Sequence, residues 1–365
     1  MSEWQTFCLK DLGKIVGGAT PSTNNPKNYG NKIAWITPKD LSTLQGRYIK
    51  KGSRSISRLG FKSCSCVLLP KHAILFSSRA PIGYVAIAKK RLCTNQGFKS
   101  IIPNKKIYFE FLYYLLKYHK DSISNIGGGT TFKEVSGATL GLFKVKIPPT
   151  YYEQQKIART LSILDQKIEN NHKINELLHT IAYKIYEYYF KHKPKNAKLE
   201  QIIIENPKSS IMVKNAQKTQ DKYPFFTSGD NILSYPKAII DGRNCFLNTG
   251  GNAGIKFYVG KASYSTDTWC ICANEFSDYL YLLLSNIKTH INQSFFQGTS
   301  LKHLQKNLLK KYPIYMPSAH EIKKFNQIIM PLLTLISINT RTSKKLEQIR
   351  DFLLPILLKQ QVKPQ

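Results

Sequence analysis

Residues 153–189 read EQQKIARTLSILDQKIENNHKINELLHTIAYKIYEYY. Apolar side chains recur along this stretch at alternating steps of four and three, at Ile157, Leu161, Leu164, Ile168, Leu178, Ala182 and Ile185. This alternation is the seam of a coiled coil. At about 1.5 Å per residue, the predicted helix would extend about 50 Å, longer than an ordinary domain helix. The stretch therefore predicts a rod-like helix.

A second helix copies the first one 168 positions further along the chain, with its seam at Phe325, Ile329, Leu332, Ile336, Leu346 and Leu353. Asn171 and Asn175 interrupt the first seam, and Asn339 and Ser343 stand at the same places in the second. Matched polar layers indicate that the two helices pack on each other in a fixed register. The alternative is that each helix lies on its own module with this layer facing water, but the repeat of the whole seam favours pairing. Pro331 is expected to kink or loosen the second helix.

The repeat extends beyond the helices. Six landmarks keep one order in both halves, and their separation falls only from 171 to 168 positions. The paired landmarks are Ser78–Gly83 with Thr249–Gly254, Thr94–Gln96 with Ser265–Asp267, Gly129–Lys133 with Gly298–Lys302, Pro149 with Pro317, Glu153 with Glu321, and Leu178 with Leu346. Chance rarely gives such an order, so the sequence predicts two copies of one unit.

Each copy opens with short β-type runs followed by a helix. In the first half these are residues 73–77 and 83–88, then a helix over 109–118; in the second they are 245–248, 255–259 and 263–272, then a helix over 279–291. The predicted fold is α+β, with two mixed α/β modules and two long helices. The expected boundaries are a first module at 1–150, a first long helix at 151–193, a second module at 194–317 and a second long helix at 318–365.

Composition limits the class of protein. The 365 residues are 42% hydrophobic, enough for two cores. Lysine and arginine number 54 against 22 acidic residues, a net charge of +32 that favours a polyanionic partner, although a basic proteome would give the same excess. Residues 1–5 do not resemble a secretory signal, and the longest apolar stretch, 328–338, is shorter than the roughly 20 residues of a membrane span. We expect a cytoplasmic chain with no membrane span.

The cysteines and histidines do not predict a metal site. Two Cys-x-Cys pairs, Cys64 with Cys66 and Cys270 with Cys272, have the spacing of thiols on one face of a strand and do not match zinc ligation. The eight histidines form no ligand-like cluster. We interpret the seven cysteines as buried thiols in a reducing compartment.

Several motifs together resemble the specificity subunit of type I restriction-modification systems, over nearly the full chain. In the first half they are GGATP at 17–21, WITPKDL at 35–41, RAPIG at 79–83, CTNQGF at 93–98 and PP at 148–149 followed by EQQKIA at 153–158. In the second half they are YPFFTSG at 223–229, GNAG at 251–254 and STDTW at 265–269.

The resemblance implies two target-recognition domains, each reading one half of a split, asymmetric site in double-stranded DNA. It also implies that the helices form an antiparallel coiled coil that holds two methyltransferase subunits, through which restriction subunits join. The stretch PSAHE at 317–321 departs from the PP and EQ pattern of the first half. A related system with a fused methyltransferase-nuclease partner is the alternative. Since a second reader must sit about 34 Å, one DNA turn, from the first, the helices are expected to act as a ruler.

Candidate DNA-binding residues lie in the loops that the repeat matches. The planar guanidinium of Arg79 suits guanine, while a phosphate contact is an equal alternative. The amides of Asn95 and Gln96 suit adenine, or they tie two turns together. Asp267 suits cytosine N4, although capping a turn is the more common role. The remaining candidates are Lys39, Lys50, Lys51, Arg54, Arg58, Ser78, Thr130, Thr131, Lys133, Asn248, Thr249, Asn252, Thr266, Trp269, Thr299, Ser300 and Lys302.

These other candidates have weaker physical reasons. Short hydroxyls and lysines after the glycine loops at 127–129 and 298 suit phosphate oxygens, with a mobile turn as the alternative. The basic stretch at 50–58 suits phosphates too, although such a run is more often a solvated edge.

The sequence predicts no catalysis by this chain and no cofactor. Base methylation needs an Asn/Asp-Pro-Pro-Tyr/Phe motif; Pro148-Pro149 lacks its flanking residues and Asn206-Pro207 lacks the second proline. There is no phosphate-binding Gly-x-x-x-x-Gly-Lys-Ser/Thr loop, and no paired carboxylates with a lysine in a nuclease-like setting. An RNA-binding signature such as an aromatic RNP sheet is not found either. Chemistry is expected from partner subunits.

Overall fold

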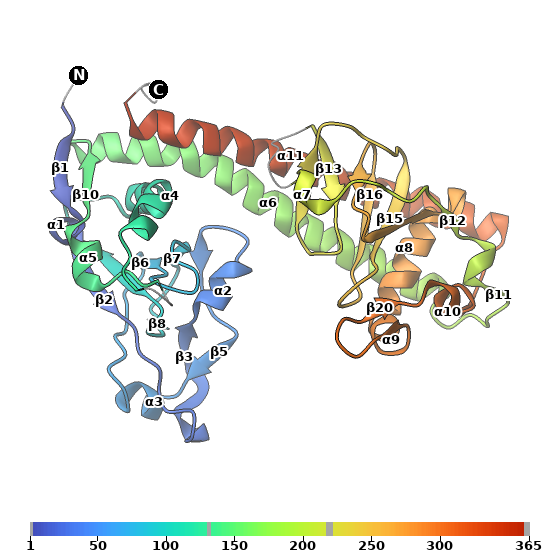
Figure 1. Ribbon diagram of the computed structural model, residues 1–365, viewed down its shortest axis with the longest axis horizontal. Coiled ribbons are helices and arrows are strands. Elements are labelled where there is room, and N and C mark those ends of the chain that lie inside the picture. The colour runs from blue at the N-terminus through green and yellow to red at the C-terminus, as the bar shows by residue number, and fades with distance from the viewer. Residues whose placement is uncertain (1–2, 130–132, 217–221, 361–365) are drawn as a thin grey trace. The chain divides into compact units, whose positions relative to one another are not determined.

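The computed structural model describes residues 3–129, 133–216 and 222–360 (Figure 1). The chain forms two compact units, one of residues 1–169 with 346–365 and the other of residues 170–345. Each unit contains one sheet-bearing module and a part of both long helices.

The first module is built on a five-stranded sheet in the order β2-β9-β6-β7-β4. The strands are β2 (Gly13–Gly17), β9 (Lys99–Pro103), β6 (Ile74–Phe76), β7 (Val85–Ala88) and β4 (Tyr48–Ile49). Alternate side chains of β6 enter two cores: Ile74 and Phe76 pack with α4 (Phe109–Asn125), and Leu75 packs on the opposite face. The sheet is therefore buried on both sides.

Smaller elements complete this module. A second sheet has the order β5-β3-β8, from β5 (Arg54–Ile56), β3 (Tyr29–Ile36) and β8 (Cys93–Thr94), and β1 (Gln5–Cys8) pairs with β10 (Lys144–Ile147). The short helices are α1 (Leu9–Leu12), η1 (Pro26–Asn28), α2 (Pro38–Ser42), α3 (Arg58–Lys62) and α5 (Gly137–Leu142). In Figure 1, α4 lies between the large sheet and the first long helix.

The second module repeats the topology. Its large sheet has the order β12-β18-β15-β16, from β12 (Ile204–Glu205), β18 (Thr268–Cys272), β15 (Arg243–Asn248) and β16 (Ile255–Val259). Its second sheet has the order β14-β13-β17, from β14 (Ile232–Tyr235), β13 (Tyr223–Phe226) and β17 (Ser263–Tyr264). The β13–β17 pair is parallel, as is the β3–β8 pair. The predicted duplication of one fold is confirmed.

The other elements of the second module also have counterparts. β11 (Ala197–Lys198) pairs with β21 (Pro313–Ile314) as β1 pairs with β10, and β19 (Phe296–Gln297) forms a hairpin with β20 (His303–Leu304). The helices are η2 (Leu199–Gln201), α7 (Val213–Ala216), η3 (Asn274–Phe276), α8 (Ser277–Asn286), α9 (Lys288–Ser294) and α10 (Lys306–Lys310).

Three local predictions need correction. The single run at 263–272 is two strands, because the Thr268 N–H donates to the Ser265 carbonyl and closes a turn. The helix predicted at 279–291 is divided into α8 and α9 at Ile287. Cys64 and Cys66 do not lie on a strand; they follow the end of α3, and the Cys64 thiol donates to the Gly60 carbonyl.

The long helices are α6 (Tyr151–Phe190) and α11 (Ala319–Leu358), each of 40 residues. Their predicted seam positions are buried or half-buried. In the second unit, Asn171 donates to Ser343 over 3.2 Å while Asn339 donates to Asn175 over 2.9 Å. Rising numbers on α6 thus meet falling numbers on α11, so the helices pair antiparallel and the predicted polar layer is confirmed. α11 is unbroken at Pro331, which lies on its exposed side.

Polar contacts attach each module to the helices of its own unit. In the first unit, Asp165 of α6 accepts from the Tyr114 hydroxyl of α4 at 2.6 Å and from Arg350 of α11 at 2.7 Å. In the second unit, Arg243 at the start of β15 pairs with Asp278 and also donates to the Thr334 hydroxyl at 3.0 Å. No helix in the described ranges is long and apolar enough to cross a membrane.

Candidate nucleic-acid interface

In the first module, loops distant in sequence meet at one end of the large sheet. The Ser78 N–H donates to the Gly97 carbonyl at 2.8 Å, and the Ser78 carbonyl accepts from the Val135 N–H at 3.0 Å. The Ala19 N–H donates to the Thr94 carbonyl at 3.0 Å. Backbone hydrogen bonds therefore bring the stretches around residues 19, 78, 96 and 135 together.

The second module makes the equivalent bonds. The Thr249 N–H donates to the Asp267 carbonyl at 3.3 Å, and the Thr249 carbonyl accepts from the Leu304 N–H at 3.0 Å. The matched loops thus come together in both modules, at the positions that the repeat in the sequence predicts.

These bonds correct the detailed register of the repeat. Ser78 and Thr249 are 171 positions apart, but Gly97 and Asp267 are 170 apart. The strand pairs place this difference in the hairpin: Ile74 pairs with Ile87 but Cys245 pairs with Phe257, so the β15–β16 connection is one residue shorter than the β6–β7 connection. Gln96 therefore corresponds to Thr266 rather than to Asp267, and the shared glycines at 83 and 254 are offset by one residue.

Four candidate side chains lie in the loops around residues 78 and 96 of the first module, and all four have partners within the protein. Asn95 Oδ1 accepts from the Gly97 N–H at 3.0 Å, and Gln96 accepts from the Thr20 hydroxyl, so both amides tie turns together. Ser78 is buried and its hydroxyl donates to Glu134. The Arg79 side chain is 39% exposed, and its guanidinium lies 3.5 Å from the Glu134 carboxylate. Arg79 is thus the candidate best placed to meet a ligand.

The basic candidates do not form one patch. Lys39 is exposed on α2, directly after Pro38, which packs beside Gly97. Lys133 is also exposed, and Thr130 and Thr131 lie outside the described residues.

Lys50 and Lys51 lie apart from the Arg79 loop. They follow β4 beside Lys89, at the end of β7, whereas Arg79 precedes the start of that strand. The guanidinium of Arg54 lies 4.0 Å from the centre of the Tyr29 ring, and Arg58 is exposed at the start of α3.

In the second module, Asn248 and Thr249 shape their own loop. Asn248 is 6% exposed; its amide donates to the Asn252 carbonyl at 3.2 Å and accepts from the Lys256 amine at 3.1 Å. Burial lowers the pKa of that amine. The Thr249 hydroxyl donates to the Asp267 carbonyl at 2.7 Å. Both side chains are therefore occupied within the protein.

The exposed candidates of this module are Asn252, Asp267, Thr299, Ser300 and Lys302. Thr266 is half-buried, and its hydroxyl donates to the Asp267 carboxylate at 3.4 Å. The Lys302 carbonyl accepts from the Gly251 N–H at 2.9 Å, which holds the β19–β20 hairpin beside the 249–252 loop.

Trp269 lies in the core. Its side chain is 3% exposed and its indole N–H donates to Glu205 Oε2 at 2.7 Å. The aromatic ring of β18 faces the module's own interior, where DNA cannot reach it, so we remove Trp269 from the proposed interface.

Sequence analysis missed Glu134, whose carboxylate contacts both Ser78 and Arg79 and also lies 3.3 Å from the Lys99 amine. The negative charge of Glu134 was the one feature of the sequence that could have identified it as a functional residue. In a chain with 22 acidic and 54 basic residues, a carboxylate directly after a loop predicted to face phosphates is unexpected.

Comparison with known proteins agrees with this architecture. The family model described as "Type I restriction modification DNA specificity domain" matches residues 1–180 and 195–348. The chain belongs to the type I restriction-modification specificity subunits.

Individual relatives support this membership. The MjaIX specificity subunit of Methanocaldococcus jannaschii is 33% identical, over 98% of this chain and 93% of its own length. The HindI specificity subunit of Haemophilus influenzae is 30% identical, over 46% of this chain and 37% of its own. The crystal structure of the S subunit from M. genitalium matches the fold with a TM-score of 0.63 at 17% identity, covering 97% of this chain and 96% of that one.

The helix pair of this specificity subunit carries a further, exposed apolar seam. In the second unit it consists of Ile174, Leu177, Ile181 and Tyr188 on α6 with Ile328, Leu335 and Ile338 on α11. A cavity of about 350 Å³ opens there, lined by Ile181, Tyr188 and Ile328 among others. In the first unit, Ile163, Ile349 and Phe352 are similarly exposed. Exposed apolar patches of this kind are typical of protein interfaces.

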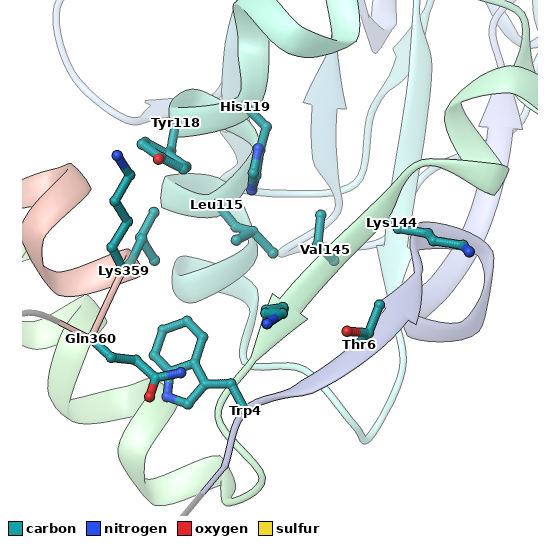
Figure 2. A pocket seen from close by; sticks show the side chains of 11 residues that line it. Trp4, Thr6, Leu115, Tyr118, His119, Lys144, Val145, Lys359 and Gln360 are labelled. Carbon is teal, nitrogen blue, oxygen red and sulfur yellow. The ribbon is translucent and has the colours of Figure 1, made fainter. Parts of the chain in front are cut away.

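A separate cleft of about 450 Å³ lies in the first unit (Figure 2). Side chains from β1 and the residue before it, from β10 and α4, and from the end of α11 and the two residues after it line the cleft: Trp4, Thr6, Leu115, Tyr118, His119, Lys144, Val145, Lys146, Leu358, Lys359 and Gln360. Burial lowers the pKa of His119. The lining has no carboxylate, so it offers no acid–base pair of carboxyl groups. Within the described ranges there is also no group of three or more histidine, cysteine or acidic side chains arranged for a metal ion.

Proposed function

We propose that this specificity subunit reads a bipartite, asymmetric site in double-stranded DNA, one half with each module. The recurrence of the same loop arrangement carries this proposal. Ser78 bonds to Gly97 and Val135 as Thr249 bonds to Asp267 and Leu304, yet the side chains around these bonds differ. Two modules with the same loop backbone and different side chains suit the recognition of two different short DNA sequences.

Charge supports contact with the DNA backbone at the same loops. Lys39 and Lys133 in the first module and Lys302 in the second are exposed there. A net charge of +32 favours DNA through release of its counterions. Phosphate contacts would set the position of each module, and base contacts would supply the specificity.

The exposed apolar seams of the helices suit the second part of the proposed function, the binding of two methyltransferase subunits. Heptad-spaced apolar side chains on paired helices fit further helices packed alongside. We assign one methyltransferase subunit to the seam of each unit, with restriction subunits joining through them. In this arrangement the partners perform the chemistry, and the specificity subunit is non-catalytic and needs no cofactor.

Co-expression with a type I methyltransferase subunit, followed by sequencing of methylated adenines, tests the proposal. The expected result is a split motif with an unread spacer. Replacing residues 1–150 with those of another specificity subunit is expected to change one half of that motif only. A continuous motif, or a change in both halves, would contradict the assignment of one half-site to each module.

A further inference from the structure

We propose that Glu134 is a positioning residue that holds Arg79 for reading a guanine in the half-site of the first module. This inference rests on the proposed function, because it assumes that the loops around residues 78 and 96 meet DNA. It selects between the two roles that the sequence leaves open for Arg79, a base contact and a phosphate contact.

Three side chains contact the carboxylate of Glu134. One carboxylate oxygen lies 3.3 Å from the Lys99 amine and 3.5 Å from the Ser78 hydroxyl, which donates to it. The other oxygen lies 3.5 Å from a terminal guanidinium nitrogen of Arg79. Lys99 and Ser78 therefore hold Glu134 from one side, and Arg79 occupies the other side.

The backbone beside Arg79 is fixed as well. The Ser77 hydroxyl donates to the Pro81 carbonyl at 2.7 Å and accepts from the Tyr84 N–H at 2.8 Å. Ala80 has a positive φ of 53°, a backbone conformation that non-glycine residues adopt where their surroundings determine it. The base of the arginine side chain is thus held by its loop, and its tip by Glu134.

The paired guanidinium keeps free donors. Arginine has five N–H groups, and the Glu134 contact involves one nitrogen, while 39% of the Arg79 side chain stays exposed. Guanine O6 and N7 accept two parallel hydrogen bonds from a guanidinium in a fixed plane. An arginine whose tip already pairs with a neighbouring carboxylate loses less conformational freedom when it binds in this way.

A carboxylate at this place opposes phosphate binding. It would be repelled by the DNA backbone and would cancel part of the arginine charge. An arginine that contacts only phosphate needs charge rather than a fixed orientation, so a neighbouring glutamate would weaken it. The presence of Glu134 therefore favours base reading by Arg79.

The second module lacks this arrangement. By the equivalent hydrogen bonds, Gly250 follows Thr249 where Arg79 follows Ser78, and His303 precedes Leu304 where Glu134 precedes Val135. The strand register places Trp269 at the position of Lys99. The paired arginine is thus a property of the first module alone, and the inferred guanine belongs to its half-site only.

The test uses the complete specificity subunit co-expressed with its methyltransferase subunit and reads the methylated motif of three variants. Arg79→Lys keeps the positive charge but loses the planar guanidinium group, and Arg79→Ala loses both. Each is expected to reduce the preference for guanine at one position of the first half-site by about tenfold to a hundredfold. Glu134→Gln is expected to weaken the preference at the same position. The second half-site should be unchanged in all three.

Lys133→Gln is the matched control, since it removes an exposed charge beside Glu134 and is expected to lower methylation at all sites without changing the motif. The inference is overturned if Arg79→Lys leaves the motif intact, or if Glu134→Gln raises methylation at all sites with no change in base preference. Either result would exclude base reading by Arg79. A wild-type motif that is not split would instead contradict the proposed function, so the two failures are distinguishable.

Discussion

The side-chain amide of Asn339 donates a hydrogen bond of 2.9 Å to the amide oxygen of Asn175, across the seam between α11 and α6. Asn175 in turn lies 3.4 Å from the Thr340 hydroxyl and the Ile336 carbonyl. One polar side chain of α6 thus meets three groups of α11. This network specifies which residues of the two helices face each other.

Removing one member of this pair is expected to destabilise the second unit. Asn175→Leu leaves the half-buried Asn339 donor without its acceptor, at a cost of about 1–3 kcal/mol. The double variant Asn175→Leu with Asn339→Leu is expected to recover that loss, because two apolar side chains can pack in the seam. Urea unfolding measures both, with exposed Asn170→Leu as the control. A double variant less stable than both single variants would contradict this account.

The ion pair between Arg243 of β15 and Asp278 of α8 is expected to hold the Arg243 side chain in place for its hydrogen bond to Thr334 of α11. Asp278 is 1% exposed; burial raises the pKa of its carboxyl and Arg243 opposes that rise. Asp278→Asn leaves a half-buried guanidinium unpaired, which is expected to cost about 3 kcal/mol in urea unfolding. Glu187→Gln is the control, since it breaks exposed pairs with Lys184 and Lys191 and is expected to change stability little. Equal losses in both variants would disprove the special role of Asp278.

Trp269 is expected to act through stability and not through DNA contact. Trp269→Ala removes a core side chain and is expected to cost about 3–5 kcal/mol, seen as a lower melting temperature. Trp269→Phe keeps most of the apolar volume and is expected to leave the methylated motif unchanged. A motif altered by the phenylalanine variant at unchanged stability would return Trp269 to the interface.

Stability is expected to fall with acidification through the half-buried His179. Burial lowers the pKa of this imidazole below its ordinary value of 6.5, and His179 lies 3.3 Å from the Tyr281 hydroxyl. As the pH falls through about 6.5, the unfolded chain takes up a proton that the folded chain resists, so stability present above this range is lost below it. His179→Gln is expected to show a smaller drop in melting temperature between pH 7.5 and pH 5.5. An identical drop in both proteins would exclude His179 as a contributor.

The spacing of the two half-sites is expected to follow helix length. Inserting seven residues after Glu169 and seven after Lys345, at the boundaries between the units, keeps the heptad seam and the contacts within each unit. One heptad adds about 10 Å, or about three base pairs of spacer in the methylated motif. Insertion in α6 alone is the control and is expected to abolish methylation. An unchanged spacer in the double insertion would show that the helices do not set it.

The long helices and the duplicated fold could be predicted because their signals are periodic or repeated. Seam residues such as Leu161 and Phe325 recur about every three and a half positions on average, and Asn175 marks the layer where the pattern changes. The order of the six repeated landmarks can likewise be recognised without knowing which residues are in contact. The strand order of the two modules then agreed with the predicted duplication.

The roles of single loop residues could not be predicted, because they depend on contacts between distant parts of the chain. Glu134 meets Arg79 only after the stretch at 133–135 packs on the loop after β6. Trp269 carries an N–H that suits DNA, yet the partner that uses it, Glu205, lies 64 positions away. The one-residue shift in the repeat could not be seen in the sequence, because Gly83 and Gly254 align there although they are not equivalent in the structure.

The loop frame of each module is held mainly by main-chain groups, as in the bonds of Ser78 with Gly97 and Val135. Main-chain bonds persist when the exposed side chains beside them are exchanged. Under the proposed function, new DNA target sequences can therefore evolve by substitutions at the loop surface, with little loss of folding stability. The same property makes these positions suitable for laboratory libraries that seek altered target sequences.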